Sequence, residues 1–213
     1  MVDKPTDGTR DRPPRQLPVP DTVSPQMQAI IAKPLDPAFN IAPQTTAQWK
    51  QRVGDGARAT EAILPALFAV LDVTVEPAEF GAAKAFVITP NSIPPANRHR
   101  LLMHLHGGIR VMNPGLAGTR EAVLMAGYVG YKVFSVDYRI PPDFPFLAAL
   151  DDAVTAYREV LKGTEARNIG IFGTSAGGSL TFTTLLRAKD EGLSMPGAIA
   201  TGTPTVDLSK TGD

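Results

Sequence analysis

The sequence contains no cysteine, and this absence excludes disulfide bonds, thiol catalysis and metal sites with cysteine ligands. Neither charge is in excess. The 21 Lys and Arg residues balance 21 Asp and Glu residues, so the composition gives no argument for a nucleic acid or an anionic membrane as a partner. Residues 1–21 contain no apolar run, which excludes a signal peptide or a membrane span there. The default expectation is a cytoplasmic protein, unless a signal has been removed.

Histidine is scarce as well, and the chain has only His99, His104 and His106. A strand would place His104 and His106 on one face, which superficially resembles a zinc site. Neither a third ligand nor a carboxylate is evident beside them, and a histidine in an apolar strand is more often a core residue than a ligand. We therefore expect no metal and no cofactor.

The most informative motif is a serine in a glycine frame, Gly173-Thr174-Ser175-Ala176-Gly177. It follows a short apolar run, residues 168–172, that is typical of a buried parallel strand, and it precedes residues with helical spacing. A strand, a sharp turn and a helix around this pattern form a nucleophile elbow, in which small residues allow close packing while the serine hydroxyl stays exposed. The motif makes Ser175 the candidate nucleophile.

A second motif, His106-Gly107-Gly108, follows another apolar strand at residues 100–105. Acyl transfer by a serine passes through a tetrahedral oxyanion, which needs N–H donors directed at the developing charge. With an elbow of this kind, the donors are the N–H groups of Ala176, Gly107 and Gly108. Glycine is needed in the loop because the backbone itself must approach the substrate. The alternative is an ordinary Gly-Gly turn at the end of a strand.

With these motifs the chain resembles the hormone-sensitive-lipase-like (bacterial family IV) carboxylesterases of the α/β-hydrolase fold, in the branch with GTSAG in place of GDSAG. The resemblance covers roughly residues 80 to 208 and also rests on residues 137–139 and 144–152. It implies an α/β fold, a mostly parallel doubly wound sheet with N-terminal cap helices. It also implies Ser175 as nucleophile, an oxyanion hole of Gly107, Gly108 and Ala176, and His106 as support of the oxyanion loop.

Two residues depart from the family pattern. Ile109 stands where a third glycine is usual, and Arg110 stands where an aromatic residue is common. A β-branched side chain is unfavourable at positive φ, so Ile109 bears on the conformation of this loop and on the acyl pocket beside it. Both donor glycines are present, and we expect the oxyanion hole to be retained.

A serine nucleophile needs a general base and a carboxylate that orients it, in the chain order Ser, then Asp or Glu, then His. All three histidines precede Ser175, and the acidic residues after it are Asp190, Glu191, Asp207 and Asp213. By the family resemblance Asp207 is a structural loop residue, and the acid comes one strand later. The family's triad is therefore not complete within this sequence.

The last apolar segment, residues 196–202, predicts a fourth strand of the doubly wound set. An open parallel sheet must be covered on both faces, and the family adds two further strands, with the acid and the histidine, beyond this point. We therefore expect the chain to be the N-terminal portion of a longer enzyme, with C-terminal strands and helices missing. The remainder is then lost, or it is a separate chain after cleavage of an exposed loop.

The expected organisation is an extended or disordered segment at 1–23, cap helices at 24–72 and the N-terminal part of the catalytic domain at 73–213. Within the cap, Ser24-Pro25 is a helix-start signal, and a second helix begins at Thr45 or Thr46. Gly54 and Gly56 are expected to interrupt this second helix. A third helix is predicted over 57–71, with a kink at Pro65.

In the catalytic part, antiparallel strands are predicted at 73–79 and 83–88, a further strand at 132–136, and an amphipathic helix over 146–161. The adjacent Asp151 and Asp152 on this helix look like a metal pair. We expect instead that one is solvated and that the other pairs with a loop arginine such as Arg139.

The function expected from these features is a serine carboxylesterase that hydrolyses short- to medium-chain acyl esters through an acyl-enzyme on Ser175. Its base and acid come from sequence beyond residue 213, and the chain-length preference is what the resemblance implies. Two alternatives remain: a non-catalytic α/β-hydrolase-like ligand-binding protein, and an acyl hydrolase of amides or carbonates. The expected partners are a small acyl ester and the C-terminal remainder of the same enzyme; a homodimer stays open.

Overall fold

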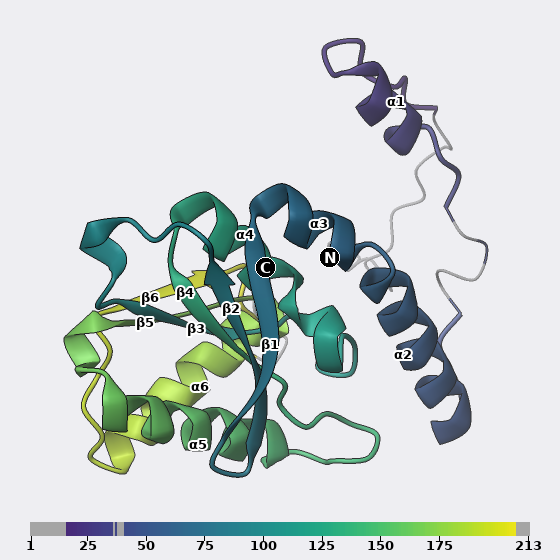
Figure 1. The fold of residues 1–213 in the computed structure, drawn as a ribbon. Coiled ribbons are helices and arrows are strands. Elements are labelled where there is room, and N and C mark those ends of the chain that lie inside the picture. The colour runs from purple at the N-terminus through teal and green to yellow at the C-terminus, as the bar shows by residue number, and fades with distance from the viewer. Residues whose placement is uncertain (1–15, 36, 38–40, 208–213) are drawn as a thin grey trace, which may run out of the picture. The chain divides into compact units, whose positions relative to one another are not determined.

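The structure is a computed structural model that describes residues 16–35, 37 and 41–207 (Figure 1). Contacts divide the chain into two units, Met1–Ala42 and Pro43–Asp213. The first unit contains α1 (Pro25–Ile31), which begins as predicted, because the Ser24 side chain accepts a hydrogen bond from the Met27 N–H at 3.3 Å. Most of the extended segment predicted at 1–23 lies outside the described residues, and the division into cap and catalytic parts stays a prediction.

The second unit is built on a six-stranded sheet with the order β1-β2-β4-β3-β5-β6 (Figure 1). The strands are β1 (Val73–Phe80), β2 (Ala83–Pro90), β3 (Leu101–Leu105), β4 (Lys132–Val136), β5 (Ile169–Thr174) and β6 (Ala198–Gly202). The first two strands pair antiparallel, and β4, β3, β5 and β6 run parallel, as predicted. The carboxyl ends of the four parallel strands therefore meet at one edge of the sheet, where ligands bind in open α/β sheets.

Helices cover both faces of this sheet, with α3 (Leu64–Leu71) and α4 (Arg120–Val129) on one face and α5 (Ala148–Gly163) and α6 (Ala176–Asp190) on the other (Figure 1). Short 3-10 helices lie at Pro95–Asn97, Gly115–Thr119 and Ala166–Asn168. The predicted helix over 146–161 corresponds to α5, whereas the pattern analysis missed α4. The layered arrangement confirms the α/β class expected from the sequence.

The helices before the sheet differ from the prediction. α2 (Thr46–Glu61) continues through Gly54 and Gly56, because a capping box between Thr45 and Gln48 fixes its start and its packing outweighs about 1 kcal/mol per glycine. α2 then ends at Glu61, and α3 begins at Leu64 with Pro65 in its first turn. Proline starts a helix there because the missing N–H would have no partner in any case, so the predicted kink at Pro65 was wrong.

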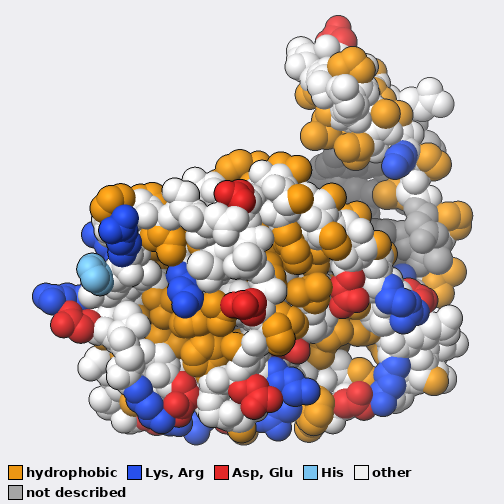
Figure 2. Space-filling model, in the orientation of Figure 1, with side chains coloured by type: hydrophobic (Ala, Val, Ile, Leu, Met, Phe, Trp, Pro, Cys, Tyr) orange, Lys and Arg blue, Asp and Glu red, His pale blue; other side chains and the backbone are white. Residues whose placement is uncertain are grey.

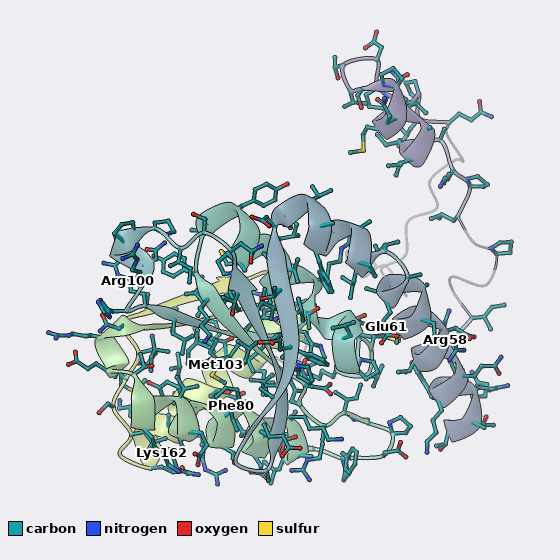
Figure 3. The ribbon with its side chains drawn as sticks, viewed as in Figure 1. Arg58, Glu61, Phe80, Arg100, Met103 and Lys162 are labelled. Atoms are coloured by element: carbon teal, nitrogen blue, oxygen red, sulfur yellow. The ribbon has the colours of Figure 1, made fainter. Side chains whose placement is uncertain are left out.

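The core lies on both faces of the sheet. Met103 of β3 is fully buried on the α5 and α6 side, and Phe80 packs edge to face with Phe134, with ring centroids 4.5 Å apart (Figure 3). On the surface, Lys and Arg side chains are interspersed with Asp and Glu (Figure 2). In the described part of the chain, no helix combines the length and the apolar character that a bilayer crossing requires.

A buried carboxylate fastens the loop after β4 to α5. Asp152 accepts hydrogen bonds from the Arg139 backbone N–H at 2.8 Å and from its guanidinium Nη2 at 2.8 Å. The side chain of Asp152 is 8% exposed, whereas Asp151 is exposed in the first turn of α5. The predicted brace between Arg139 and one of the two aspartates is confirmed.

Asp152→Ala is expected to lower the free energy of unfolding by about 2–3 kcal/mol, because it leaves the Arg139 donors without their acceptor. The matched control Asp151→Ala should cost no more than about 0.5 kcal/mol, the value of a carboxylate near a helix N-terminus. Urea unfolding of both variants measures the difference. Equal losses would contradict the brace.

Candidate active site

Ser175 lies in the sharp turn between β5 and α6. Its backbone has φ 57° and ψ −120°, a sparsely populated conformation for a residue with a side chain. Two backbone hydrogen bonds keep the turn in place: the Ser175 N–H donates to Gly202 O at 2.8 Å, and the Ser179 N–H donates to Ser175 O at 3.0 Å. The predicted strand–turn–helix geometry of the elbow is therefore present.

The glycines on either side of Ser175 allow β5 and α6 to approach the end of β3. A Cβ at Gly173 would lie 2.3 Å from Leu105 O, and a Cβ at Gly177 would lie 1.9 Å from the same oxygen. Real Cβ atoms do not occur at such distances, so both positions require glycine. The small-residue frame predicted from the sequence has this packing as its physical reason.

The loop after β3 contacts the elbow directly. A Cβ on Gly107 would lie 2.7 Å from Thr174 O and 3.7 Å from Ser175 Cβ. Gly108 follows with φ 130°, and Ala176 is the first residue of α6, where the N–H groups of the opening turn have no partner within the helix. The structure therefore brings the predicted nucleophile and the predicted donor positions to one edge of the sheet.

The two departures from the family pattern both adopt left-handed backbone. Ile109 has φ 48° and Arg110 has φ 68°, and the Ile109 side chain is 66% exposed. Hydrogen bonds from the Val111 and Met112 N–H groups to Gly108 O, at 3.0 and 2.8 Å, close the turn. The loop thus keeps the conformation that a glycine would favour, at a cost of about 1–2 kcal/mol per residue.

The buried His106 side chain supports this loop through contacts with Gly107 and Tyr138. Its ring stacks on Tyr138 with centroids 4.1 Å apart, the Tyr138 hydroxyl donates to His106 O, and Nδ1–H donates to Gly107 O at 2.9 Å. Nε2 is buried and has no hydrogen-bond partner among the described residues. Burial lowers the pKa of His106 to about 4, because a proton on Nε2 would place a charge where no acceptor lies.

His104 is a satisfied core residue, as the sequence suggested. It is fully buried, with Nδ1 2.9 Å from Ser135 Oγ and Nε2 3.1 Å from Glu121 Oε2. The hydrogen bond with His104 lowers the pKa of the Glu121 carboxyl. Glu121 was not predicted from the sequence, because it lies on α4, 53 positions before the Thr174 hydroxyl that donates to it.

His99 is exposed and precedes β3, at the opposite end of the strand from the elbow. Within the described part of the chain, none of the three histidines shares a hydrogen bond with Ser175. The segment after β6 packs close to the elbow, since Ser179 Oγ of α6 donates to Thr205 O at 2.8 Å. Asp207 lies at the exposed end of this segment.

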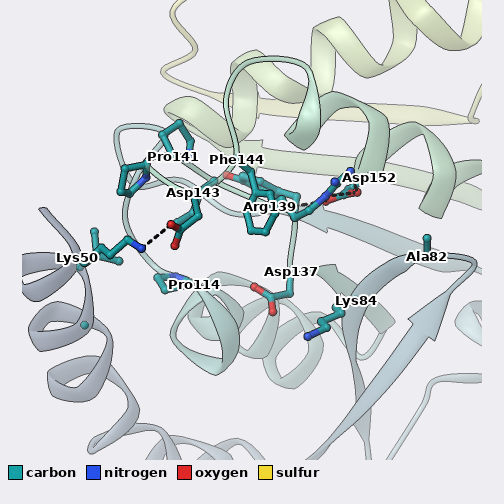
Figure 4. Close-up of a pocket in the computed structure, with 15 residues that line it drawn as sticks. Lys50, Ala82, Lys84, Pro114, Asp137, Arg139, Pro141, Asp143, Phe144 and Asp152 are labelled. Atoms are coloured by element: carbon teal, nitrogen blue, oxygen red, sulfur yellow. Dashed lines mark hydrogen bonds and ion pairs between the residues drawn. The ribbon is translucent and has the colours of Figure 1, made fainter. Parts of the chain in front are cut away.

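A cleft of about 520 Å³ lies at the carboxyl end of β4 (Figure 4). Its lining does not include Ser175 or the loop glycines. Two ion pairs line it, Lys50–Asp143 at 2.5 Å and Arg139–Asp152 at 2.8 Å (Figure 4). Burial raises the pKa of the Asp137 carboxyl, which accepts a hydrogen bond from the Gly115 N–H at 2.7 Å. Because the cleft is lined by neither Ser175 nor the loop glycines, the candidate active site is Ser175 with the loop beside it.

The chain is similar to proteins of the α/β-hydrolase fold. A family model described as alpha/beta hydrolase fold matches residues 102–213. An acetyl-hydrolase of Streptomyces hygroscopicus is 33% identical over 52% of this chain and 37% of its own length. Hormone-sensitive lipase of Bos taurus is 33% identical over 52% of this chain and 15% of its own length.

Among solved structures, esterase E25 superposes with a TM-score of 0.85 at 33% identity, covering 96% of this chain and 64% of that one. The chain therefore spans less than two thirds of each of these relatives. The matched residues include both motifs and all four parallel strands except the first residue of β3. The family model, the sheet order and the elbow together show that the chain belongs to the α/β-hydrolase fold family, among its hormone-sensitive-lipase-like members.

Proposed function

We propose that the protein is a serine carboxylesterase with Ser175 as its nucleophile. The observation that carries the proposal is the strained turn of Ser175 beside Gly107 and at the start of α6. Ser175 Oγ attacks the acyl carbonyl, and the N–H groups of Gly107, Gly108 and Ala176 stabilise the oxyanion. The intermediate collapses to an acyl-enzyme with loss of the alcohol, and water then releases the acid and restores the serine.

The general base is proposed to come from sequence beyond residue 213, on the same chain or on a separate one. In this fold the acid and the histidine follow the nucleophile, and the relatives that match are longer than this chain. His106 is a poor candidate for the base, because burial lowers its pKa to about 4 and so its affinity for a proton, and its contacts are to Tyr138 and Gly107. His104 is engaged by Ser135 and Glu121.

The substrates are proposed to be short- to medium-chain acyl esters. The family resemblance supports this class, and one of the relatives is named an acetyl-hydrolase. Amide or carbonate substrates would use the same serine and oxyanion donors, so only assays separate them. A ligand-binding role without catalysis is the second candidate, favoured by the lack of a hydrogen bond between Ser175 and any histidine in the described residues.

Ser175→Ala in the full-length protein is expected to lower kcat for p-nitrophenyl acetate by about 10⁴-fold or more, because the nucleophile is lost. Ser194→Ala is the matched control: Ser194 is exposed, and its backbone carbonyl, which the substitution keeps, accepts a hydrogen bond from the Tyr157 hydroxyl. Steady-state kinetics of both variants, with circular dichroism to check folding, make the comparison. An active Ser175→Ala variant would exclude Ser175 as nucleophile.

Gly108→Ala is expected to lower kcat roughly 100-fold with little change in KM, because oxyanion donors act on the transition state. A Cβ at this position meets Met112 O at 2.7 Å, and φ is 130°, so the loop must shift. Gly163→Ala serves as the control, since nothing lies within 4 Å of its Cβ position. Unchanged kcat in Gly108→Ala would show that this loop does not contribute donors.

His106 is expected to make the protein less stable in mild acid. The folded-state pKa of about 4 lies below the ordinary histidine value of 6.5, so the stabilisation is complete above pH 6.5 and is lost as the pH falls toward 4. In His106→Asn, the slope of unfolding free energy against pH in this window should decrease, by up to about 1.4 kcal/mol per pH unit. Chemical denaturation at several pH values measures the slope in both proteins. An unchanged slope in His106→Asn would contradict a buried neutral ring.

A further inference from the structure

Polar side chains from four elements form a connected set behind the elbow. Ser135 of β4 and His104 of β3 share a hydrogen bond, and His104 Nε2 lies 3.1 Å from Glu121 Oε2 of α4. The other carboxylate oxygen, Glu121 Oε1, accepts a hydrogen bond from the Thr174 hydroxyl at the end of β5. The set therefore ends at the residue that immediately precedes Ser175.

Thr174 lies against both the glycine loop and the β6 residue that binds the Ser175 N–H. Its carbonyl oxygen lies against Gly107, where a Cβ would come within 2.7 Å. Its side chain lies against Gly202 of β6, where a Cβ would come within 2.9 Å of the hydroxyl oxygen. Gly202 in turn accepts the hydrogen bond from the Ser175 N–H. A shift of Thr174 would thus move both the nucleophile and the glycine loop.

We propose that Glu121 is a positioning residue, whose carboxylate fixes Thr174 and thereby sets the place of Ser175 relative to the oxyanion donors. The inference rests on the proposed function of Ser175. A strained backbone persists only where its surroundings hold it, and hydrogen bonds to a carboxylate are stronger than neutral ones. Glu121 lies in the first turn of α4, where the helix dipole stabilises a negative charge.

The test compares variants that remove one partner of the Glu121–Thr174 hydrogen bond with variants that keep it. Glu121→Met and Thr174→Val preserve approximate size and remove the acceptor or the donor. Glu121→Gln and Thr174→Ser retain an acceptor and a donor, and serve as the conservative counterparts. Glu159→Met is the matched control on α5, where Glu159 pairs with Lys162 at the surface.

The readout is the second-order rate constant for phosphonylation of Ser175 by a fluorophosphonate, measured by mass spectrometry on the full-length protein, with a melting temperature for each variant. Glu121→Met and Thr174→Val should each react roughly 10- to 100-fold more slowly than wild type, because small displacements at a nucleophile have large kinetic costs. The Gln and Ser variants should stay within about threefold of wild type, since they keep a hydrogen bond.

A double variant, Glu121→Met with Thr174→Val, separates positioning from general stabilisation. If Glu121 acts through Thr174, the second substitution adds little, and the combined rate loss is much smaller than the product of the single losses. A structural role alone lowers the melting temperature and leaves the rate constant of the folded protein unchanged. Should Glu121→Met fail to fold, the rate constants of Thr174→Val and Thr174→Ser alone test the positioning role: a slower Thr174→Val supports it, and equal rates contradict it.

The two hypotheses fail in different ways. If wild-type Ser175 does not react with the probe, the proposed function is overturned and this inference with it. If wild type reacts and Glu121→Met and Thr174→Val react at the same rate, the inference alone is overturned. Slower reaction in these two variants, with normal reaction in Thr174→Ser and Glu159→Met, supports the positioning role.

Discussion

The approach of β5 and α6 to the end of β3 is the constraint on which the candidate site depends. Leu105 O occupies the space that a side chain at position 173 or 177 would need. With glycine at both positions, the turn between them lies directly against the loop that begins at Gly107. A larger residue at either position would separate Ser175, the proposed nucleophile, from the proposed oxyanion donors.

The site combines this close packing with strained backbone conformations, and nearby hydrogen bonds hold the strained residues in place. Ser175, Ile109 and Arg110 all have positive φ. The first is held by Gly202 O, and the other two lie in a turn closed onto Gly108 O. The stacked rings of His106 and Tyr138 support the glycine loop. The site thus rests on parallel strands and buried rings, which suits a reaction that needs fixed donors.

Local sequence signals were reliable where one short segment decides the structure. The Ser24 cap, the pairing of Arg139 with one of two adjacent aspartates, and the elbow between an apolar run and a helical segment were all predicted. They were less reliable where packing competes with propensity. α2 continues through its glycines because of its capping box and its buried face, and Pro65 begins a helix instead of bending one.

By itself, the sequence determined the α/β class, the elbow and the glycine loop, because strand periodicity and small residues at fixed spacing are local properties. It also established that every histidine precedes Ser175. Only the tertiary structure decided that Ile109 takes a left-handed conformation, that the His106 ring is buried and neutral, and that Glu121 reaches Thr174. These features depend on contacts between residues far apart in the chain, and no local pattern encodes such contacts.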